Sequence, residues 1–233
     1  AITNCLNFGN PENKEIMGEF AECIQGIKEA CEFLNFPVVS GNVSFYNGTN
    51  QKSIFPTPVI GGVGLIPDIS KTLNHYFKKE NSNILVIGKT FGHIEQSCFL
   101  KENFSISEGL PPEINLNNEK NNGETVLQLI RKNLVTSVHD ISSGGLLVAL
   151  SEMSIGSNLG AKVYKPKKLT NIFEYFFGED QGRYIIEVEK ANLEKVIKML
   201  NGNEVYYENI GKTQAKNFEV ESEFNIGVND LFK

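Results

Sequence analysis

The sequence predicts a mixed fold of the α/β or α+β class, with helices and strands arranged in two layers. Short runs of Val, Ile and Leu bounded by Gly and Pro indicate strands, and they alternate with segments whose apolar residues recur at helical spacing. The connections between these elements are short, as expected when helices pack on a sheet. The polar stretch SKTLNHYFKKENSN at residues 70–83 interrupts the pattern and predicts a junction between two domains.

Composition limits the classes of function. The chain has 233 residues and a net charge of -6, which argues against nucleic acid as a partner. No apolar run approaches the roughly 20 residues that span a bilayer, so no membrane association is expected. The four cysteines form no C-x-x-C pair, which predicts reduced thiols in a cytoplasmic protein. Because the chain opens on strand-like residues without Met, we expect that a longer protein precedes it.

The first elements are a strand and a long helix. Residues 1–8, AITNCLNF, predict a short strand that ends in a turn. Asn10 as N-cap, followed by Pro11, predicts the start of a helix, and apolar residues at helical spacing continue to Leu34. Pro37 ends this helix.

The stretch from Pro37 to Ile66 is the most informative for function. Two β-type runs, PVVS and TPVIGGVGLI, enclose a predicted loop rich in Gly, Asn, Ser and Thr. Gly41 allows a ligand to approach the backbone, and Asn42 and Ser44 offer a carbonyl oxygen and a hydroxyl to a metal, a phosphate or a sugar. We therefore expect binding groups in this loop.

Strands and helices alternate again after residue 82. NILVIG at 83–88 predicts a buried strand, 103–122 a polar loop, and about 123–132 a helix. The stretch SVHDISSGGLLVALSEM at 137–153 predicts a strand, a turn and a helix from about Gly144. Its helix start, with Ser142 and Ser143, suits either an anion site or a capped helix packed closely on the sheet, and the sequence does not decide between them.

The second polar cluster is FGEDQGRY at 177–184, which includes Glu179. It suits an internal charge network better than a binding site. His93 in GHIEQS suits a helix cap or a surface position better than a catalytic base. Two nucleotide motifs fail: a P-loop ending at Gly88 would need Gly where Asn83 stands, and Pro67 occupies the third glycine position of a dinucleotide fingerprint.

Several motifs taken together resemble a known family. TNCLNFGNPE, PVVSGNVSFYN, PTPVIGGVGLI, GHIEQS, SVHDISSGGLLVALSEM and FGEDQGRY occur in the order found in phosphoribosylformylglycinamidine synthase. The resemblance is to the C-terminal half of the large synthetase subunit, within the superfamily of aminoimidazole ribonucleotide synthetase. It implies a barrel-forming α/β domain at 1–78, truncated at its N-terminus, and a two-layer α+β domain at 79–233.

The resemblance also implies an activity and partners. ATP, with Mg²⁺, would activate formylglycinamide ribonucleotide, and ammonia derived from glutamine would displace phosphate to form the amidine in purine biosynthesis. The partners implied are the N-terminal half of the same chain, a glutaminase subunit and a small accessory subunit. With its barrel strands unpaired, this chain alone is expected to form a homodimer.

Four site residues carry over from the family motifs. Asn4 and Gly41 match ATP contacts, Asn42 a magnesium ligand, and Ser44 a substrate contact. Asn4 is often Asp in relatives, so a charge is lost at this position. The family's catalytic histidines, a phosphate-contacting lysine and its acidic magnesium ligands lie in the other half.

No catalytic residue is therefore predicted in this chain. Its histidines, His75, His93 and His139, fall outside the matching motif. We expect the 233 residues alone to be inactive as a ligase. An alternative function is a non-catalytic module of the same superfamily that binds nucleotide or docks the glutaminase.

Overall fold

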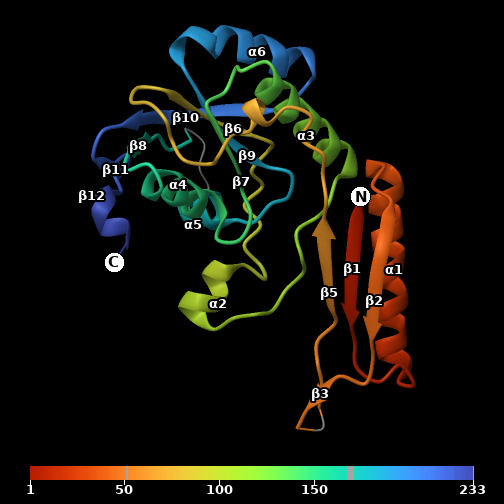
Figure 1. The fold of residues 1–233 in the computed structure, drawn as a ribbon. Coiled ribbons are helices and arrows are strands. Elements are labelled where there is room, and N and C mark those ends of the chain that lie inside the picture. Colours follow the sequence, from red (N-terminus) through yellow and green to blue (C-terminus); the bar gives the residue numbers. More distant parts are fainter. Residues whose placement is uncertain (51, 167–170, 233) are drawn as a thin grey trace. The chain divides into compact units, whose positions relative to one another are not determined.

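The computed structural model describes residues 1–50, 52–166 and 171–232. The chain divides into two compact units, Ala1–Pro67 and Asp68–Lys233 (Figure 1). Each unit is described below by itself.

The division comes earlier than the expected boundary after residue 78. The ring of Phe77 is buried in the core of the second unit, with 2% of its surface exposed. The backbone N–H of Phe77 also donates to the carbonyl of Met153, at 3.2 Å. The connecting segment from Asp68 onward thus packs with the second unit rather than the first.

The first unit is a three-stranded sheet with one long helix. Its elements are β1 (Ile2–Asn7), α1 (Lys14–Leu34), β2 (Val38–Ser44), the short pair β3 (Gly48–Thr49) and β4 (Lys52–Ser53), and β5 (Thr57–Gly62). The strand order is β2-β1-β5, so β1 is central and both other strands are edges. β1 pairs with β2 in parallel, through the α1 crossover, and with β5 antiparallel.

Helix α1 begins later than expected. Its N-cap is Asn13, whose side chain accepts the N–H of Glu15, whereas Asn10 accepts the N–H of Glu12 in the preceding turn. At the other end Asn35 adopts the left-handed conformation, and its N–H bonds to the carbonyl of Cys31. Asn10 and Pro11 therefore form a turn that leads into the helix instead of its first residues.

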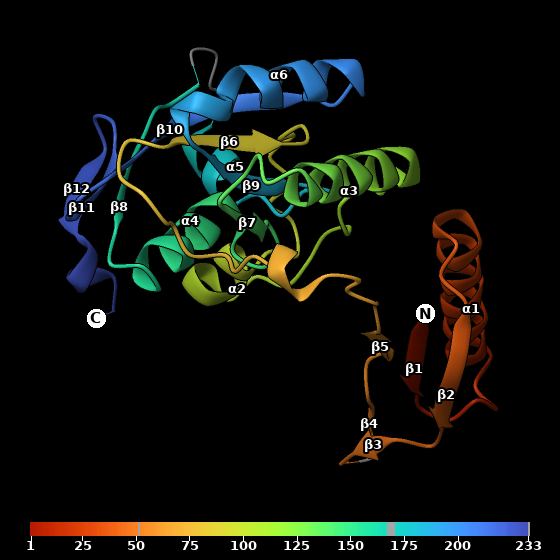
Figure 2. The same cartoon turned by 45° about the horizontal axis from the view of Figure 1, so that its top comes forward.

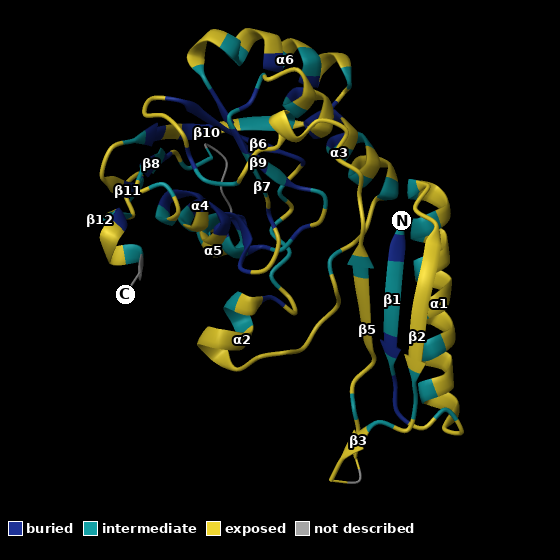
Figure 3. Ribbon diagram, in the orientation of Figure 1, coloured by how far each residue is buried: buried dark blue, intermediate teal, exposed yellow. Residues whose placement is uncertain are grey.

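Few residues of the first unit are buried. The described residues of α1, β2 and β5 include none in the buried class, and these elements are mostly yellow in Figure 3. The buried apolar side chains lie on or just after β1: Ile2, Leu6 and Phe8. Phe8 packs edge-on against Phe20 of α1, with ring centroids 5.1 Å apart.

The second unit is built on a seven-stranded sheet. Its strands are β6 (Asn83–Ile87), β7 (Ser137–Asp140), β8 (Gly160–Val163), β9 (Tyr184–Val188), β10 (Tyr207–Gln214), β11 (Asn217–Val220) and β12 (Phe224–Gly227). Its helices are α2 (Cys98–Phe104), α3 (Leu116–Arg131), α4 (Gly145–Ile155), α5 (Ile172–Phe177) and α6 (Leu193–Gly202), with 3₁₀ turns at Ile69–Lys71, Lys190–Asn192 and Val228–Phe232. The strand order is β12-β11-β8-β10-β6-β9-β7.

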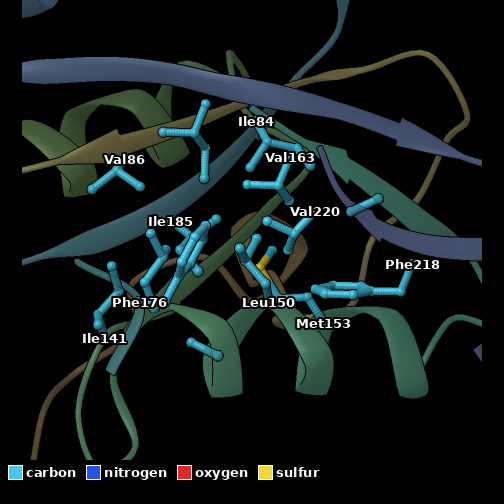
Figure 4. Close-up of a cluster of buried hydrophobic side chains, with 14 of the residues drawn as sticks. Ile84, Val86, Ile141, Leu150, Met153, Val163, Phe176, Ile185, Phe218 and Val220 are labelled. Atoms are coloured by element: carbon cyan, nitrogen blue, oxygen red, sulfur yellow. The ribbon is translucent and has the colours of Figure 1, made fainter. Parts of the chain in front are cut away.

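Helices cover both faces of this sheet. On one face, α4 and α5 pack on a cluster that includes Ile84, Leu150 and Phe176, drawn in Figure 4. On the other, α3 and α6 pack on a cluster that includes Leu85 and Leu129, and Figure 2 shows the two sets of helices on either side of the strands. The second unit therefore has one layer more than the two predicted. The sequence of β6 is consistent with this third layer, because all five of its residues are buried, as in a strand covered by helices on both faces.

Helix α3 begins at Leu116, inside the polar loop expected at 103–122, and α2 reaches the first two residues of that range. Ser97 caps α2 by accepting the N–H of Leu100, and Asn115 caps α3 by accepting the N–H of Asn118. The start of α3 is rich in Asn, Glu and Lys, so it has no apolar stripe that would reveal it. In the described ranges, no helix combines the length and apolar character needed to cross a membrane.

Candidate functional site

The first residues of the loop predicted after Ser40, Gly41 to Ser44, lie in strand β2. Gly41 stands opposite Asn4 of β1, and Asn42 stands opposite Cys5. The strand continues through Ser44 because backbone pairing with β1 continues that far. The prediction of a loop was wrong here because Gly, Asn and Ser are typical of loops.

Gly41 leaves room for the side chain of Asn4. A Cβ atom added at Gly41 would overlap the amide oxygen of Asn4. Asn4 lies two residues before Leu6 on β1 and shares a face of the sheet with it. Both border a groove of about 700 Å³ whose opposite wall includes Ile24, Ile27 and Cys31 of α1. Asn4 and Gly41 thus lie together on the face of the sheet that α1 covers.

Asn42 lies on the opposite face, beside Cys5. Its amide Nδ2 donates to the sulfur of Cys5 at 3.7 Å. The amide of Asn7, two residues farther along β1, donates to the same sulfur at 3.6 Å and to the carbonyl oxygen of Thr57 at 3.3 Å. Two amides are therefore held around one thiol on the face that α1 does not cover.

Ser44 shares this second face and stands opposite Asn7. Its hydroxyl donates to the side-chain oxygen of Asn47 at 3.2 Å. The amide of Asn47 donates in turn to the backbone carbonyls of Ser44 and Phe8, at 3.0 and 3.1 Å. The hydroxyl of Ser44 is thereby held in a fixed place at the end of the strand.

The four predicted site residues therefore form two pairs on opposite faces of one sheet. Asn42 and Ser44 lie on the polar face, and Asn4 and Gly41 lie on the face toward α1. Sequence reasoning missed the other members of the polar face, Cys5 and Asn7. Their alternation with Asn4 and Leu6 along TNCLN, typical of a strand with two different faces, is the signal that could have found them.

Glu179 connects the starts of α4 and α2, although α4 has no side-chain cap at its N-cap residue Gly144. The N–H of Gly144 donates to the carboxylate of Glu179 at 2.8 Å, and the same oxygen accepts the N–H of Cys98 at the start of α2. One internal carboxylate thus serves the first turns of two helices, where a negative charge is favoured. Both alternatives for Ser142 and Ser143 stay predictions, because no side chain caps α4 and Glu179 accepts only the N–H of the N-cap residue Gly144.

The remaining polar groups of FGEDQGRY form an internal network. The carboxylate of Asp180 accepts the backbone N–H groups of Phe91, Gly92 and His93 at 2.9, 2.9 and 3.1 Å. Arg183, with 1% of its surface exposed, donates to the carbonyl of Gly178 at 2.6 Å and also to that of Asp180. Burial lowers the pKa of its guanidinium, and the charge of Asp180 opposes this shift. The network ties the loop after β6 to the turn before β9.

The histidines have structural partners. His139 lies between the carboxylates of Asp140 and Glu152, at 3.2 and 3.0 Å, and its ring is 4.8 Å from that of His75. His93 contacts the backbone carbonyl of Leu110 at 2.9 Å. Among the residues that the structure describes, no group of three or more His, Cys, Asp or Glu side chains is placed to hold a metal ion.

A second cavity, of about 320 Å³, lies within the second unit. Phe91, Asn118, Glu119 and Gln181 contribute to its wall. Burial raises the pKa of Glu119, and within the described part of the chain no hydrogen bond or ion pair reaches its carboxylate. This cavity contains none of the four predicted site residues.

Two family models cover most of the chain. Residues 1–66 match the N-terminal domain of the AIR synthase related proteins, and residues 79–222 match the C-terminal domain of the same proteins. The chain belongs to this family. The two matched ranges leave residues 67–78, which contain the division between the compact units, outside both domains.

Relatives within the family are similar along the whole chain. The chain is 52% identical over 233 residues to the phosphoribosylformylglycinamidine synthase subunit PurL of Pelagibacter ubique, and 46% identical over 231 residues to that of Bradyrhizobium diazoefficiens. These matches cover 100% and 99% of this chain but only 32% and 31% of the relatives. The chain therefore spans about a third of the length of these curated relatives.

Solved structures of the family share the fold. Thermotoga maritima PurL complexed with FGAR matches 99% of this chain at a TM-score of 0.72 and 16% identity, over 39% of its own length. The PurLQS structure from the same organism matches 99% of this chain at 0.69 and 18% identity, over 37% of its own length. These matches confirm the predicted class, a two-domain unit of mixed α/β and α+β structure of the aminoimidazole ribonucleotide synthetase type.

Proposed function

We propose that this chain is part of the C-terminal half of an ATP-dependent synthetase that forms an amidine in purine biosynthesis. The substrates would be formylglycinamide ribonucleotide, ATP and ammonia derived from glutamine, and the enzyme would be a C–N bond-forming ligase. The observation that carries the proposal is the 52% identity with a PurL subunit over all 233 residues. Fold neighbours from Thermotoga maritima were solved in complex with ATP and with FGAR, which supports the choice of substrates.

The site proposed on this chain is the β1–β2 pair. Asn4 and Gly41 would contact ATP, Asn42 would bind Mg²⁺, and Ser44 would contact the substrate. β2 is an edge strand, so a nucleotide can reach the backbone of Gly41 along that edge even though Asn4 and Asn42 lie on different faces.

The residues fit Mg²⁺ as contributors to a shared site. The carbonyl oxygen of Asn42 and the hydroxyl of Ser44 are neutral oxygen ligands, and Mg²⁺ commonly keeps waters and phosphate oxygens beside one or two protein ligands. When bound, Mg²⁺ would neutralise charge on the phosphates during phosphoryl transfer. The role of this chain would be to orient the nucleotide and the substrate, with the acidic ligands and the catalytic histidines supplied by the other half.

The partners proposed are the remainder of the synthetase, a glutaminase subunit and a small accessory subunit. One fold neighbour, PurLQS from Thermotoga maritima, supports a proposal of partner subunits. We place the complex in the cytoplasm. The chain alone would be inactive and would form a homodimer through its exposed β strands.

An amidine-forming assay tests the proposal. Formylglycinamide ribonucleotide, ATP, Mg²⁺ and an ammonium salt are supplied to the chain alone and to a fusion of the chain with the part of the Pelagibacter ubique relative that it does not match. The expected result is product from the fusion only. An inactive fusion would contradict the proposed function, and product from the chain alone would contradict the assignment of the catalytic groups to the other half.

The alternative is a non-catalytic module that binds nucleotide or docks a glutaminase. Calorimetry with ATP and Mg²⁺ separates this alternative from the proposed synthetase. Tight binding by the isolated chain, lost in Asn42→Ala, would favour the module, whereas a shared site predicts tight binding only in the fusion.

A further inference from the structure

The sulfur of Cys5 is the point where two amide side chains of the polar face meet. Asn42 donates to it across the β1–β2 pair at 3.7 Å, and Asn7 donates to it along β1 at 3.6 Å. Cys5 itself is only partly exposed, and its thiol contacts the side-chain oxygen of Asn7 at 3.9 Å. A thiol sulfur is a weak acceptor, so each contact alone is weak. The two contacts involve amides that lie on the same face of the sheet.

These contacts fix which end of each amide is available. An Asn side chain carries its donor and its acceptor at the two ends of one planar group. Because the Nδ2 of Asn42 is directed at Cys5, its Oδ1 is directed away from that sulfur. For Asn7, the Nδ2 also donates to the carbonyl oxygens of Cys5 and Thr57 at 3.4 and 3.3 Å, and its Oδ1 accepts the thiol of Cys5 at 3.9 Å, which leaves one lone pair of this oxygen for another partner.

The other cysteines make no such contacts. Cys23 and Cys31 lie on helix α1, and Cys98 is exposed at the start of α2. Within the described part of the chain, no side-chain hydrogen bond reaches any of these three sulfurs. Among the described cysteines, only Cys5 thus accepts hydrogen bonds from two side-chain amides. Cys23 therefore serves as a control for the loss of a thiol that makes no such contact.

We propose that Cys5 is a positioning residue that aims the carbonyl oxygen of Asn42 at a divalent cation, and that Asn7 supplies a second amide oxygen to the same site. This inference rests on the proposed function of Asn42. It adds a binding residue and a positioning residue to the β1–β2 pair. Cys5 acts here through its sulfur as an acceptor, so no oxidation or covalent step is involved.

The test uses side-chain amide NMR signals of the whole chain, with Mn²⁺ as the paramagnetic probe. Without metal, Cys5→Ala is expected to shift the Nδ2 signals of Asn42 and Asn7, whereas Cys23→Ala leaves them unchanged. With Mn²⁺ and a non-hydrolysable ATP analogue, both amides should broaden in the parent fusion with the unmatched part of the Pelagibacter ubique relative, because the shared site is complete only there. In that fusion, Cys5→Ala should weaken the broadening of Asn42 by less than about fivefold, since a sulfur acceptor contributes less than an ordinary hydrogen bond, and Cys5→Ser should recover part of it.

Each outcome addresses a different claim. If the metal-free signals of Asn42 do not respond to Cys5→Ala, the positioning role is overturned. If Mn²⁺ broadens the Asn42 signal equally in the parent and in Cys5→Ala, the positioning role of Cys5 is also overturned. If Mn²⁺ broadens the signal of Asn42 but not that of Asn7, the proposal that Asn7 supplies a second oxygen is overturned. If Mn²⁺ broadens neither amide while the metal-free shift occurs, the proposed metal role of Asn42 fails, although the contact with Cys5 stands.

Discussion

In the second unit a seven-stranded sheet carries helices on both faces, and its strand β6 is buried throughout. In the first unit the described residues of β2 and β5 include none that are buried, and apolar side chains such as Val39 and Leu65 are 68% and 90% exposed. The helices of the second unit thus cover both apolar faces of its own sheet. The first unit presents a sheet face, two strand edges and apolar side chains that another polypeptide could cover.

The polar residues differ in the same way. Glu179, Asp180 and Arg183 of the second unit are hydrogen-bonded to the backbone and serve the fold. Asn42 and Ser44 of the first unit lie on a face that α1 does not cover. The polar residues of the second unit therefore stabilise its fold, whereas Asn42 and Ser44 of the first unit are the residues proposed to bind ligands.

The largest effect should come from the buried guanidinium. Arg183→Met removes the donor to Gly178 and leaves Asp180 without its positive neighbour, so the free energy of unfolding should fall by about 3–5 kcal/mol. Urea denaturation of the chain measures it. Arg131→Met, a change of the same kind at an exposed helix end, is the control and should alter stability by less than about 0.5 kcal/mol. Equal effects would mean that Arg183 is not part of the core.

One substitution made in both units sharpens the contrast. Leu150→Ala opens a cavity in the second unit, because Leu150 is 0% exposed, and should lower the unfolding free energy by about 2–5 kcal/mol. Leu65→Ala in the first unit removes a side chain that is 90% exposed and should change it by about 0.5 kcal/mol or less. Comparable losses in the two variants would break the comparison.

Glu179→Gln should have an intermediate effect. The carboxylate accepts the first N–H groups of α2 and α4, and its charge favours both helix starts, so its neutralisation should cost about 1–3 kcal/mol. Hydrogen exchange of the Cys98 and Gly144 amides should accelerate together. Glu108→Gln, at an exposed loop position, is the matched control. Exchange that rises at only one of the two helices would show that the cap is not shared.

The smallest effect is expected at high pH. A hydrogen bond to Glu208 raises the pKa of Tyr206 to about 12, so the folded chain keeps this phenol protonated when the unfolded chain has lost its proton. Stability from this group is present below about pH 10 and is lost as the pH rises from there toward about 12. In an ultraviolet titration of the tyrosines, the absorbance change near pH 12 should be smaller in Tyr206→Phe than in the parent chain. An unchanged titration curve would contradict the assignment.

The sequence predicted those parts of the fold that depend on apolar pattern. The run NILVI predicted a buried strand, and the glycines at 144 and 145 predicted the start of α4. The prediction from sequence failed where the residue types of a segment are not typical of the helix or strand that the segment forms. The start of α3 is polar, and the Gly-Asn-Ser residues of β2 are typical of a loop but are held in a strand by pairing with β1.

The site was predictable only in part for the same reason. Family motifs supplied Asn4, Gly41, Asn42 and Ser44, but they gave no register between β1 and β2. That register decides which residues share a face, and it places Asn42 beside Cys5 and not beside Asn4. Since pairing between distant segments depends on the whole unit, a local motif cannot supply it.

Native-state hydrogen exchange tests the central claim most directly. The chain alone is compared with its fusion to the unmatched part of the Pelagibacter ubique relative. At protein concentrations low enough to keep the chain monomeric, we predict that the amides of β6 and β9 are protected in both samples, whereas those of β2 and β5 exchange fast in the chain alone and become protected in the fusion. Equal protection of β2 and β5 in the two samples would contradict the claim that the first unit is completed by another part of the synthetase.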